Sequence, residues 1–313
     1  MQNGFLRIAL IATGVLGLTG LASAQAYQER AAQPAPVIAW IPKPIELTPY
    51  AAPHKPHTKL AEVLQQHQGE ARWREPVVND PDLRADWVQM APGDKTPTVY
   101  AADHRTSFIV WDGQVRVSIG GQEPFVASKG FMVQVPYRTA FSLETVGDAP
   151  SLYFQVSNAD ATLLYPEGDT PPPPPEGTEW YRGRLQGQDT YERQNSAPYL
   201  DFFAATAQEP GPRGAFTRDD RSFLNIIRGQ GIPRPADTER GHFHVNYAEF
   251  WFVMEGQISY LIEGVPYFVA DPGDIVYAAP GRFHRAAWAG EGMSTRIAIN
   301  GYPGGSHHYE PPH

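Results

Sequence analysis

The 313-residue sequence contains no cysteine. This absence excludes disulfide bonds, thiolate metal sites and cysteine nucleophiles. The chain must be held together by hydrophobic cores, and its length is sufficient for two of them. Basic residues are outnumbered, with 25 Lys and Arg against 34 Asp and Glu, and they form no cluster. An acidic chain without a basic patch is a poor binder of nucleic acids and of anionic membranes.

Long apolar runs are lacking beyond the N-terminus. Arg7 precedes an apolar stretch, residues 8–21, that ends in Ala22-Ser23-Ala24. This order is typical of a secretory signal peptide, and the stretch is short for a membrane span, which needs about 20 residues. We therefore expect a cleaved signal over residues 1–24, a periplasmic or secreted protein, and no membrane span after cleavage. An uncleaved anchor is the alternative.

Three candidate metal ligands, His242, His244 and Glu249, lie close together, and a fourth, His284, follows beyond two turn glycines. Residues i and i+2 of a strand face the same side, so the first two imidazoles can point to one centre. Glu249 has the opposite parity, and we expect a turn over residues 245–248 to return it to the same cavity. Three imidazoles and one carboxylate would leave one or two coordination positions for water or substrate.

Residues 249–288 alternate aromatic and β-branched runs with glycine and proline turns. This spacing predicts a β-sandwich or a β-barrel.

The segment around the candidate ligands resembles the cupin superfamily, whose first motif is G-x5-H-x-H-x3-4-E-x6-G. The chain matches this motif at His242, His244, Glu249 and Gly256, with Ala236 in place of the leading glycine. The second motif is G-x5-P-x-G-x2-H-x3-N, in which Ala279 and Trp288 replace the proline and the asparagine. The chain keeps the other three residues of that motif, Gly273, Gly281 and His284.

An internal repeat extends the resemblance to most of the chain. A shift of 143 residues overlays residues 106–141 on residues 249–284 without a gap, and the turn glycines coincide. We therefore predict an all-β fold of two cupin-type barrels, of jelly-roll or double-stranded β-helix form, in tandem. In the first copy the four ligand positions hold Val99, Ala101, Thr106 and Phe141.

The first barrel is accordingly predicted to bind no metal at that place and to serve structure, by covering the second barrel or by closing a dimer. His104 lies near the lost site without partners, and it is interpreted as a satisfied or an exposed histidine.

Proline is abundant, at 31 residues, and it indicates the domain boundaries. Residues 33–56 should form an extended arm that could pack on another subunit, residues 59–67 a short helix, and the five prolines 171–175 a stiff spacer. The predicted organisation is a signal peptide (1–24), an arm with the helix (25–70), the first barrel (71–165), a linker (166–200), the metal-binding barrel (201–303) and a flexible tail (304–313).

Strand parity also suggests the substrate pocket. Trp251 shares the face of Glu249, and Tyr260 points inward from the next strand, so the cavity should be apolar and aromatic; both residues could equally be barrel core. Arg228 and Arg282 are candidate partners for an acidic substrate, and surface arginines are the alternative.

The donor set suits one divalent transition metal per chain, with Fe or Mn favoured over Cu, Ni and Zn. The resemblance implies an enzyme, and the aromatic cavity favours a dioxygenase-like oxidoreductase similar to quercetinase-type bicupins. In such an enzyme Glu249 would act as a base toward a small hydrophobic or aromatic substrate, with O2 as the second substrate.

Other functions remain open at this point. The alternatives are a metal-dependent decarboxylase, lyase or isomerase, a non-catalytic periplasmic metal- or ligand-binding protein, and a purely structural bicupin. The resemblance also implies a homodimer, because proteins of this superfamily commonly dimerise.

Overall fold

The computed structural model describes residues 38–231, 236, 238–301 and 307–310. The predicted signal peptide, the start of the arm and part of the tail lie outside the described residues. The chain divides into two units, Met1–Pro42 and Lys43–His313, and the helices and strands named below all belong to the second. No helix in the described ranges is long and apolar enough to cross a membrane.

The first barrel is built from two main sheets. The larger has the strand order β12-β8-β5-β10-β3-β2, with β2 (Trp73–Asn79), β3 (Leu83–Met90), β5 (Thr106–Asp112), β8 (Phe131–Val135), β10 (Ser151–Asn158) and β12 (Tyr199–Asp201). The smaller has the order β7-β6-β9, with β6 (Val115–Ile119), β7 (Phe125–Ala127) and β9 (Phe141–Thr145). A short pair joins β4 (Tyr100–Ala101) and β11 (Leu163–Leu164).

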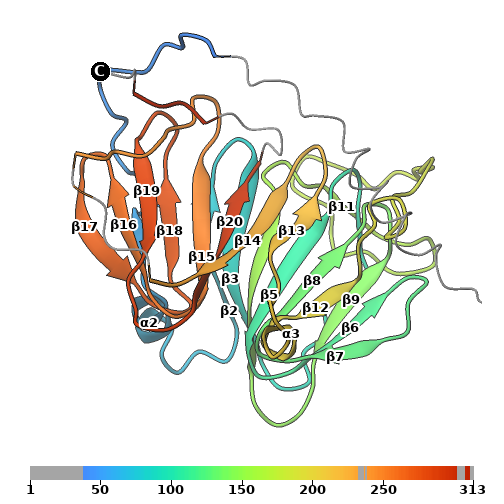
Figure 1. Ribbon diagram of the computed structural model, residues 1–313. Helices are drawn as coiled ribbons and strands as arrows, with labels where there is room; N and C mark the ends of the chain where they lie inside the picture. Colours follow the sequence, from blue (N-terminus) through green and yellow to red (C-terminus); the bar gives the residue numbers. More distant parts are fainter. Residues whose placement is uncertain (1–37, 232–235, 237, 302–306, 311–313) are drawn as a thin grey trace, which may run out of the picture. The chain divides into compact units, whose positions relative to one another are not determined.

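The second barrel repeats this plan (Figure 1), and its strands β15 to β20 are drawn in orange to red. Its larger sheet has the order β1-β18-β15-β20-β14-β13, with β1 (His57–Thr58), β13 (Gly214–Arg218), β14 (Phe223–Gly229), β15 (Glu249–Glu255), β18 (Ile275–Ala278) and β20 (Ser294–Asn300). Its smaller sheet has the order β17-β16-β19, with β16 (Ile258–Ile262), β17 (Val265–Ala270) and β19 (His284–Trp288). Two short helices, α2 (Leu60–Gln66) and α3 (Phe202–Thr206), complete the fold.

The structure confirms the predicted all-β fold of two barrels in tandem. The strands β5, β6 and β9 of the first barrel begin 143 residues before β15, β16 and β19 of the second. In both barrels the middle strand of the smaller sheet pairs with the strand that follows the last turn, in the same antiparallel register. The sequence repeat is therefore a repeat of strand pairing.

Central strands of the larger sheets, such as β5 and β15, are buried on both faces, which explains their continuous apolar sequences. In β15, Trp251 and Val253 point into the core of the second barrel, whereas Phe250 and Phe252 belong to a separate cluster. That cluster also contains Trp87, from the first barrel. One hydrophobic core thus lies between the two larger sheets, and one further core fills each barrel.

Two strands lie outside the predicted domain limits. β12 starts in the predicted linker and pairs with β8, so it covers an edge of the first barrel that would otherwise stay unpaired. β1, from the predicted arm, covers β18 of the second barrel in the same way. Tyr50 donates a hydrogen bond to the carbonyl oxygen of Tyr277 at 3.0 Å. The described end of the arm thus packs on this chain's own second barrel, where the sequence suggested another subunit.

Candidate metal centre

The four predicted ligands meet inside the second barrel. Glu249 is the first residue of β15 and His284 the first of β19. His242 forms an isolated bridge with His284, whose N–H donates to the carbonyl oxygen of His242 at 2.8 Å. Gly241 has φ +82°, and a Cβ at this position would overlap the carbonyl oxygen of His284. Glycine therefore permits the close approach that joins two ligands distant in sequence.

The expected turn between His244 and Glu249 is present as a bend at residues 245–247. The stretch before the bend is not a regular strand, because His242 and Phe243 each make only an isolated bridge. Because of this bend, the side chain of Glu249 faces the same cavity as the two histidines, although its parity along the chain is opposite to theirs.

The ligand atoms converge closely. Nε2 of His244 and Nε2 of His284 lie 3.1 and 3.2 Å from Oε2 of Glu249. Nε2 of His242 lies 3.1 Å from Nε2 of His284 and 3.8 Å from Oε2 of Glu249. Adjacent ligands at about 2.1 Å from a metal are about 3.0 Å apart in an octahedron and about 3.4 Å apart in a tetrahedron. Three of the four distances therefore fall between the octahedral and the tetrahedral values, as expected for ligands of one metal ion.

Hydrogen bonds orient the imidazoles. Nδ1 of His284 donates to the carbonyl oxygen of Arg282 at 2.9 Å, so the lone pair of Nε2 points at Glu249. The hydroxyl of Tyr247 lies 2.7 Å from Nδ1 of His244 and holds that ring as well. A nitrogen lone pair and a carboxylate oxygen at 3.2 Å repel each other unless a cation or a proton lies between them. This donor set therefore fits a divalent metal.

The protonation states agree with this role. Burial by itself raises the pKa of Glu249, but the imidazoles of His242, His244 and His284 outweigh it and hold that pKa well below its ordinary value. Burial lowers the pKa of His242, against the opposing effect of Glu249. An ionised carboxylate and a neutral imidazole are the forms that bind a metal.

A cavity of about 210 Å³ opens beside the four ligands. Alternate residues of three neighbouring strands face it, as strand parity requires. These residues are Phe223, Asn225 and Ile227 of β14, Glu249 and Trp251 of β15, and Arg296, Ala298 and Asn300 of β20.

Of the predicted pocket residues, Trp251 lines this cavity, with its ring centroid 5.2 Å from that of His284. Tyr260 is fully buried behind Trp251, with 5.3 Å between ring centroids, and belongs to the barrel core. Tyr260 therefore does not line the cavity. It is a core residue of the barrel, which was the alternative interpretation from the sequence.

The two predicted arginines also lie outside the cavity. Arg228 has the opposite parity to the lining residues of β14, and its Nε donates to Glu255 at 2.9 Å. Arg282 donates to the backbone oxygens of Glu263 and Thr48, at 2.6 Å each. Arg282 thus ties the arm to the barrel, and neither guanidinium lines the cavity.

An arginine that the sequence analysis overlooked does line the cavity. Arg296 makes no ion pair within the described residues, and its Nε is buried without a hydrogen-bond partner there. Burial lowers the pKa of Arg296, while Tyr260 and Glu249 oppose this effect. Because a guanidinium stays protonated in proteins, the cavity contains a fixed positive charge beside the metal ligands.

The described part of the predicted tail lies at the same cavity. His308 exchanges two backbone hydrogen bonds with Phe243, at 3.0 and 3.1 Å. The exposed His307 lines the cavity, with its ring centroid 4.3 Å from that of His242. Since these contacts are with the ligand segment, the tail residues 307–310 are part of the site, whereas the sequence suggested a flexible end.

The first barrel has no such cluster among its described residues. Val99 and Phe141 form the bridge that His242 and His284 form in the second barrel, with apolar side chains in place of imidazoles. His104 is 1% exposed.

No family model matches the sequence, and no curated protein matches it. Among solved structures, a mutant of Bacillus subtilis oxalate decarboxylase has a TM-score of 0.45 at 13% identity, covering 77% of this chain and 74% of that chain. A second structure of the same enzyme, described for its Mn(II) centres, has a TM-score of 0.44 at 14% identity with the same coverage.

A cupin 2 conserved barrel domain protein from Leptotrichia buccalis has a TM-score of 0.49 at 13% identity, covering 78% of this chain and 94% of that chain. Likenesses this distant carry no argument about activity, which must come from the site itself.

Proposed function

We propose that this protein is a metal-dependent enzyme with one divalent ion per chain, held only in the second barrel, and that it acts on a small carboxylate. The observation that carries the proposal is Arg296, a half-buried cation that faces the same cavity as the metal ligands and has no ion-pair partner among the described residues. Its guanidinium lies over the ring of Trp288 at 5.0 Å, and its Nε is buried without a hydrogen-bond partner in those residues. A carboxylate on the substrate would supply the missing negative charge. This substrate differs from the hydrophobic or aromatic compound that the sequence favoured.

The reaction that fits best is decarboxylation or a related lyase reaction. The metal would supply a Lewis acid for a substrate oxygen. Arg296 would hold the substrate carboxylate, and Trp251 would provide an apolar wall that keeps water away from it. In a decarboxylation the electron pair of the broken C–C bond stays on carbon and takes up a proton, and carbon dioxide leaves.

We infer Mn or Fe, with Cu, Ni and Zn as alternatives, because a mixed set of imidazole and carboxylate ligands suits these ions. His242, His244, Glu249 and His284 would occupy four positions. The remaining positions would face the cavity, where the substrate and Arg296 meet.

A dioxygenase-type oxidoreductase is the second candidate. Trp251 lies against the ligand His284, so an aromatic substrate could stack in the cavity. Open positions on the ion would then serve both the substrate and O2. We also propose that the apolar N-terminus is a cleaved export signal. The enzyme would then act outside the cytoplasm, whichever of the two reactions it catalyses.

The test begins with elemental analysis of untagged mature protein, with His284→Ala as the control. We expect close to one Mn or Fe per chain, lost in the variant. Carbon dioxide release and O2 consumption are then measured with a panel of small mono- and dicarboxylates. Release without O2 consumption supports the lyase, and stoichiometric O2 consumption supports the dioxygenase. Bound metal with neither reaction would leave a metal-binding protein and refute both.

Arg296→Met tests the carboxylate assignment, and Arg228→Met is its matched control on the neighbouring strand. Loss of a charged hydrogen bond to substrate should raise KM about tenfold or more in Arg296→Met. Arg228→Met should keep the KM of the wild type, because its guanidinium pairs with Glu255 outside the cavity. Equal KM values in all three proteins would contradict the proposal.

A further inference from the structure

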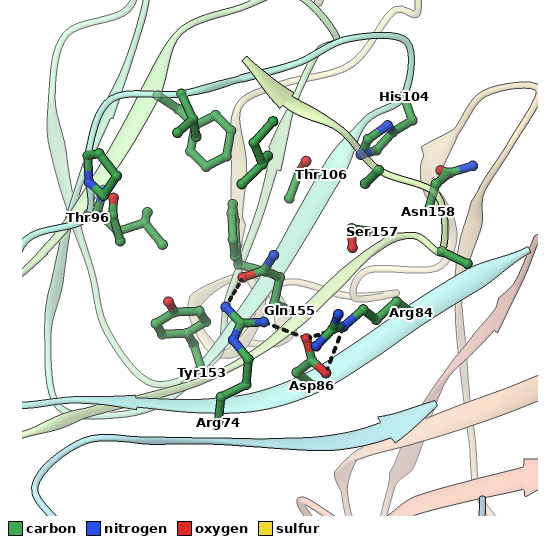
Figure 2. Close-up of a pocket in the computed structure, with 18 of the residues that line it drawn as sticks. Arg74, Arg84, Asp86, Thr96, His104, Thr106, Tyr153, Gln155, Ser157 and Asn158 are labelled. Atoms are coloured by element: carbon green, nitrogen blue, oxygen red, sulfur yellow. Dashed lines mark hydrogen bonds and ion pairs between the residues drawn. The ribbon is translucent and has the colours of Figure 1, made fainter. Parts of the chain in front are cut away.

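The first barrel encloses a cavity of about 380 Å³ at the place where the second barrel holds its metal site. Val99, Thr106 and Phe141, the counterparts of three metal ligands, all line it. The repeat has thus lost its ligands but kept an internal space of the size that small molecules occupy. Figure 2 shows this cavity.

One part of the lining is apolar. Phe108, Phe141 and Leu143 are buried, and the ring centroids of the two phenylalanines lie 5.7 Å apart. Tyr153, the counterpart of Arg296, is also buried here. The metal-site cation is therefore absent from its equivalent position, and this wall suits the apolar body of a ligand.

A different pair of arginines brings positive charge to the cavity. Arg74 and Arg84 both bond to Asp86, whose side chain is 2% exposed, with 3.0 Å between Nε of Arg84 and Oδ2 of Asp86. Two guanidiniums against one carboxylate leave a net positive charge. Within the described residues the terminal nitrogens of Arg84 make no hydrogen bond, and its side chain is 43% exposed. These nitrogens remain available for a carboxylate.

Two buried acceptors face the same space. Nε2 of His104 and Oδ1 of Asn158 have no hydrogen-bond partner within the described residues, and the two residues are 1% and 5% exposed. Nδ1 of His104 lies 3.4 Å from Asp103, which places the proton on Nδ1 and the lone pair on Nε2.

Burial lowers the pKa of His104, so the ring is neutral at pH 7. Buried acceptors left unpaired are costly, and a hydroxyl donor on a ligand would satisfy Nε2 of His104. Figure 2 shows His104, Asn158 and Arg84 along one side of the cavity, with Thr96 across from them.

We propose that the first barrel binds, without a metal, a small carboxylic acid that has an apolar body and a hydroxyl group. The carboxylate pairs with Arg84, the hydroxyl donates to Nε2 of His104, and the apolar body lies on the wall of Phe108 and Phe141. This site is independent of the metal centre and of the function proposed for it.

The test is calorimetric titration of the full mature protein with 4-hydroxycinnamate. Cinnamate lacks the hydroxyl and 4-hydroxycinnamyl alcohol lacks the charge, so each should bind about tenfold more weakly than 4-hydroxycinnamate. His284→Ala, which removes a metal ligand of the second barrel, should bind all three probes as the wild type does.

Two variants assign the contacts. Arg84→Met should lose the preference for the acid over the alcohol, and His104→Leu the preference for the hydroxylated acid over cinnamate. Arg116→Met, which removes an exposed ion pair with Glu144 in the same barrel, is the control and should change neither preference. His104→Leu removes a buried unpaired nitrogen, so its melting temperature should equal or exceed that of the wild type.

The proposal fails if none of the three probes binds at millimolar concentration. It also fails if both variants keep the wild-type preferences. Binding that disappears in His284→Ala would assign the ligand to the metal cavity and overturn the proposal equally.

Discussion

Binding of a metal in the second barrel should raise the melting temperature of the whole unit Lys43–His313. The two larger sheets share one core, in which the ring centroid of Phe252 lies 5.7 Å from that of Trp87 and 5.4 Å from that of Phe154. Unfolding of the second barrel alone would expose this core to water. We therefore expect a single transition that responds to a ligand bound in only one barrel.

The size of the shift follows from mass action. A ligand at one hundred times its Kd stabilises the folded state by about 2.7 kcal/mol. An entropy of unfolding of about 2.1 cal/mol/K per residue gives about 0.57 kcal/mol/K for a unit of roughly 270 residues. The melting temperature should therefore rise by about 5 °C.

The assay is differential scanning calorimetry of chelator-treated protein with increasing Mn(II), and His284→Ala is the control. The variant should show little response, because it loses one of four ligands. Two separate transitions, with only one that moves, would refute the shared core as the route of coupling. An equal rise in His284→Ala would show that Mn(II) stabilises the protein from another site.

Three further predictions concern single residues. Phe252→Ala should cost about 3–5 kcal/mol, or about 5–9 °C in calorimetry; a shift below about 2 °C would contradict tight packing of the shared core. The pKa of His104 is lowered by burial, so the unfolded chain takes up a proton below about pH 6.5 before the folded one does. Wild-type stability should fall in that range as pH decreases, and urea denaturation at pH 7.5 and 5.5 should show a smaller fall for His104→Leu. His307→Ala opens the cavity beside His242 and should speed metal loss to a chelator about tenfold in stopped-flow measurements; unchanged loss would place His307 outside the metal environment.

Strand parity accounts for most of what the sequence could predict. The spacing of His242 and His244, the bend before Glu249 and the turn before His284 are local features, and local features are visible in sequence. The repeat predicted the first barrel, because turn glycines and buried strands recur at a fixed distance. The sequence left open whether the first barrel covers the second or closes a dimer, since an apolar strand such as β15 does not reveal which partner covers its second face.

The same parity rule separates Arg228 from Arg296. Arg228 was considered because it ends an apolar strand, yet the lining residues of β14 are Phe223, Asn225 and Ile227, and residue 228 faces the other way. Arg296 alternates with Ala298 and Asn300 on β20 and could have been found by extending the rule to that strand. What the rule cannot supply is the pairing of β20 with β15, which is non-local and sets Arg296 beside the ligands.

The first barrel shows why a lost motif is weak evidence for a lost site. The sequence comparison was confined to the four ligand positions, and apolar residues there indicated a structural cover. The shift of 143 residues sets His104 on Tyr247, which lines the metal cavity, so the comparison could have been extended to this histidine. Without the three imidazoles and the carboxylate, the first barrel still encloses a cavity. The charge of Arg84 and the unpaired nitrogen of His104 give this cavity groups that can bind a ligand.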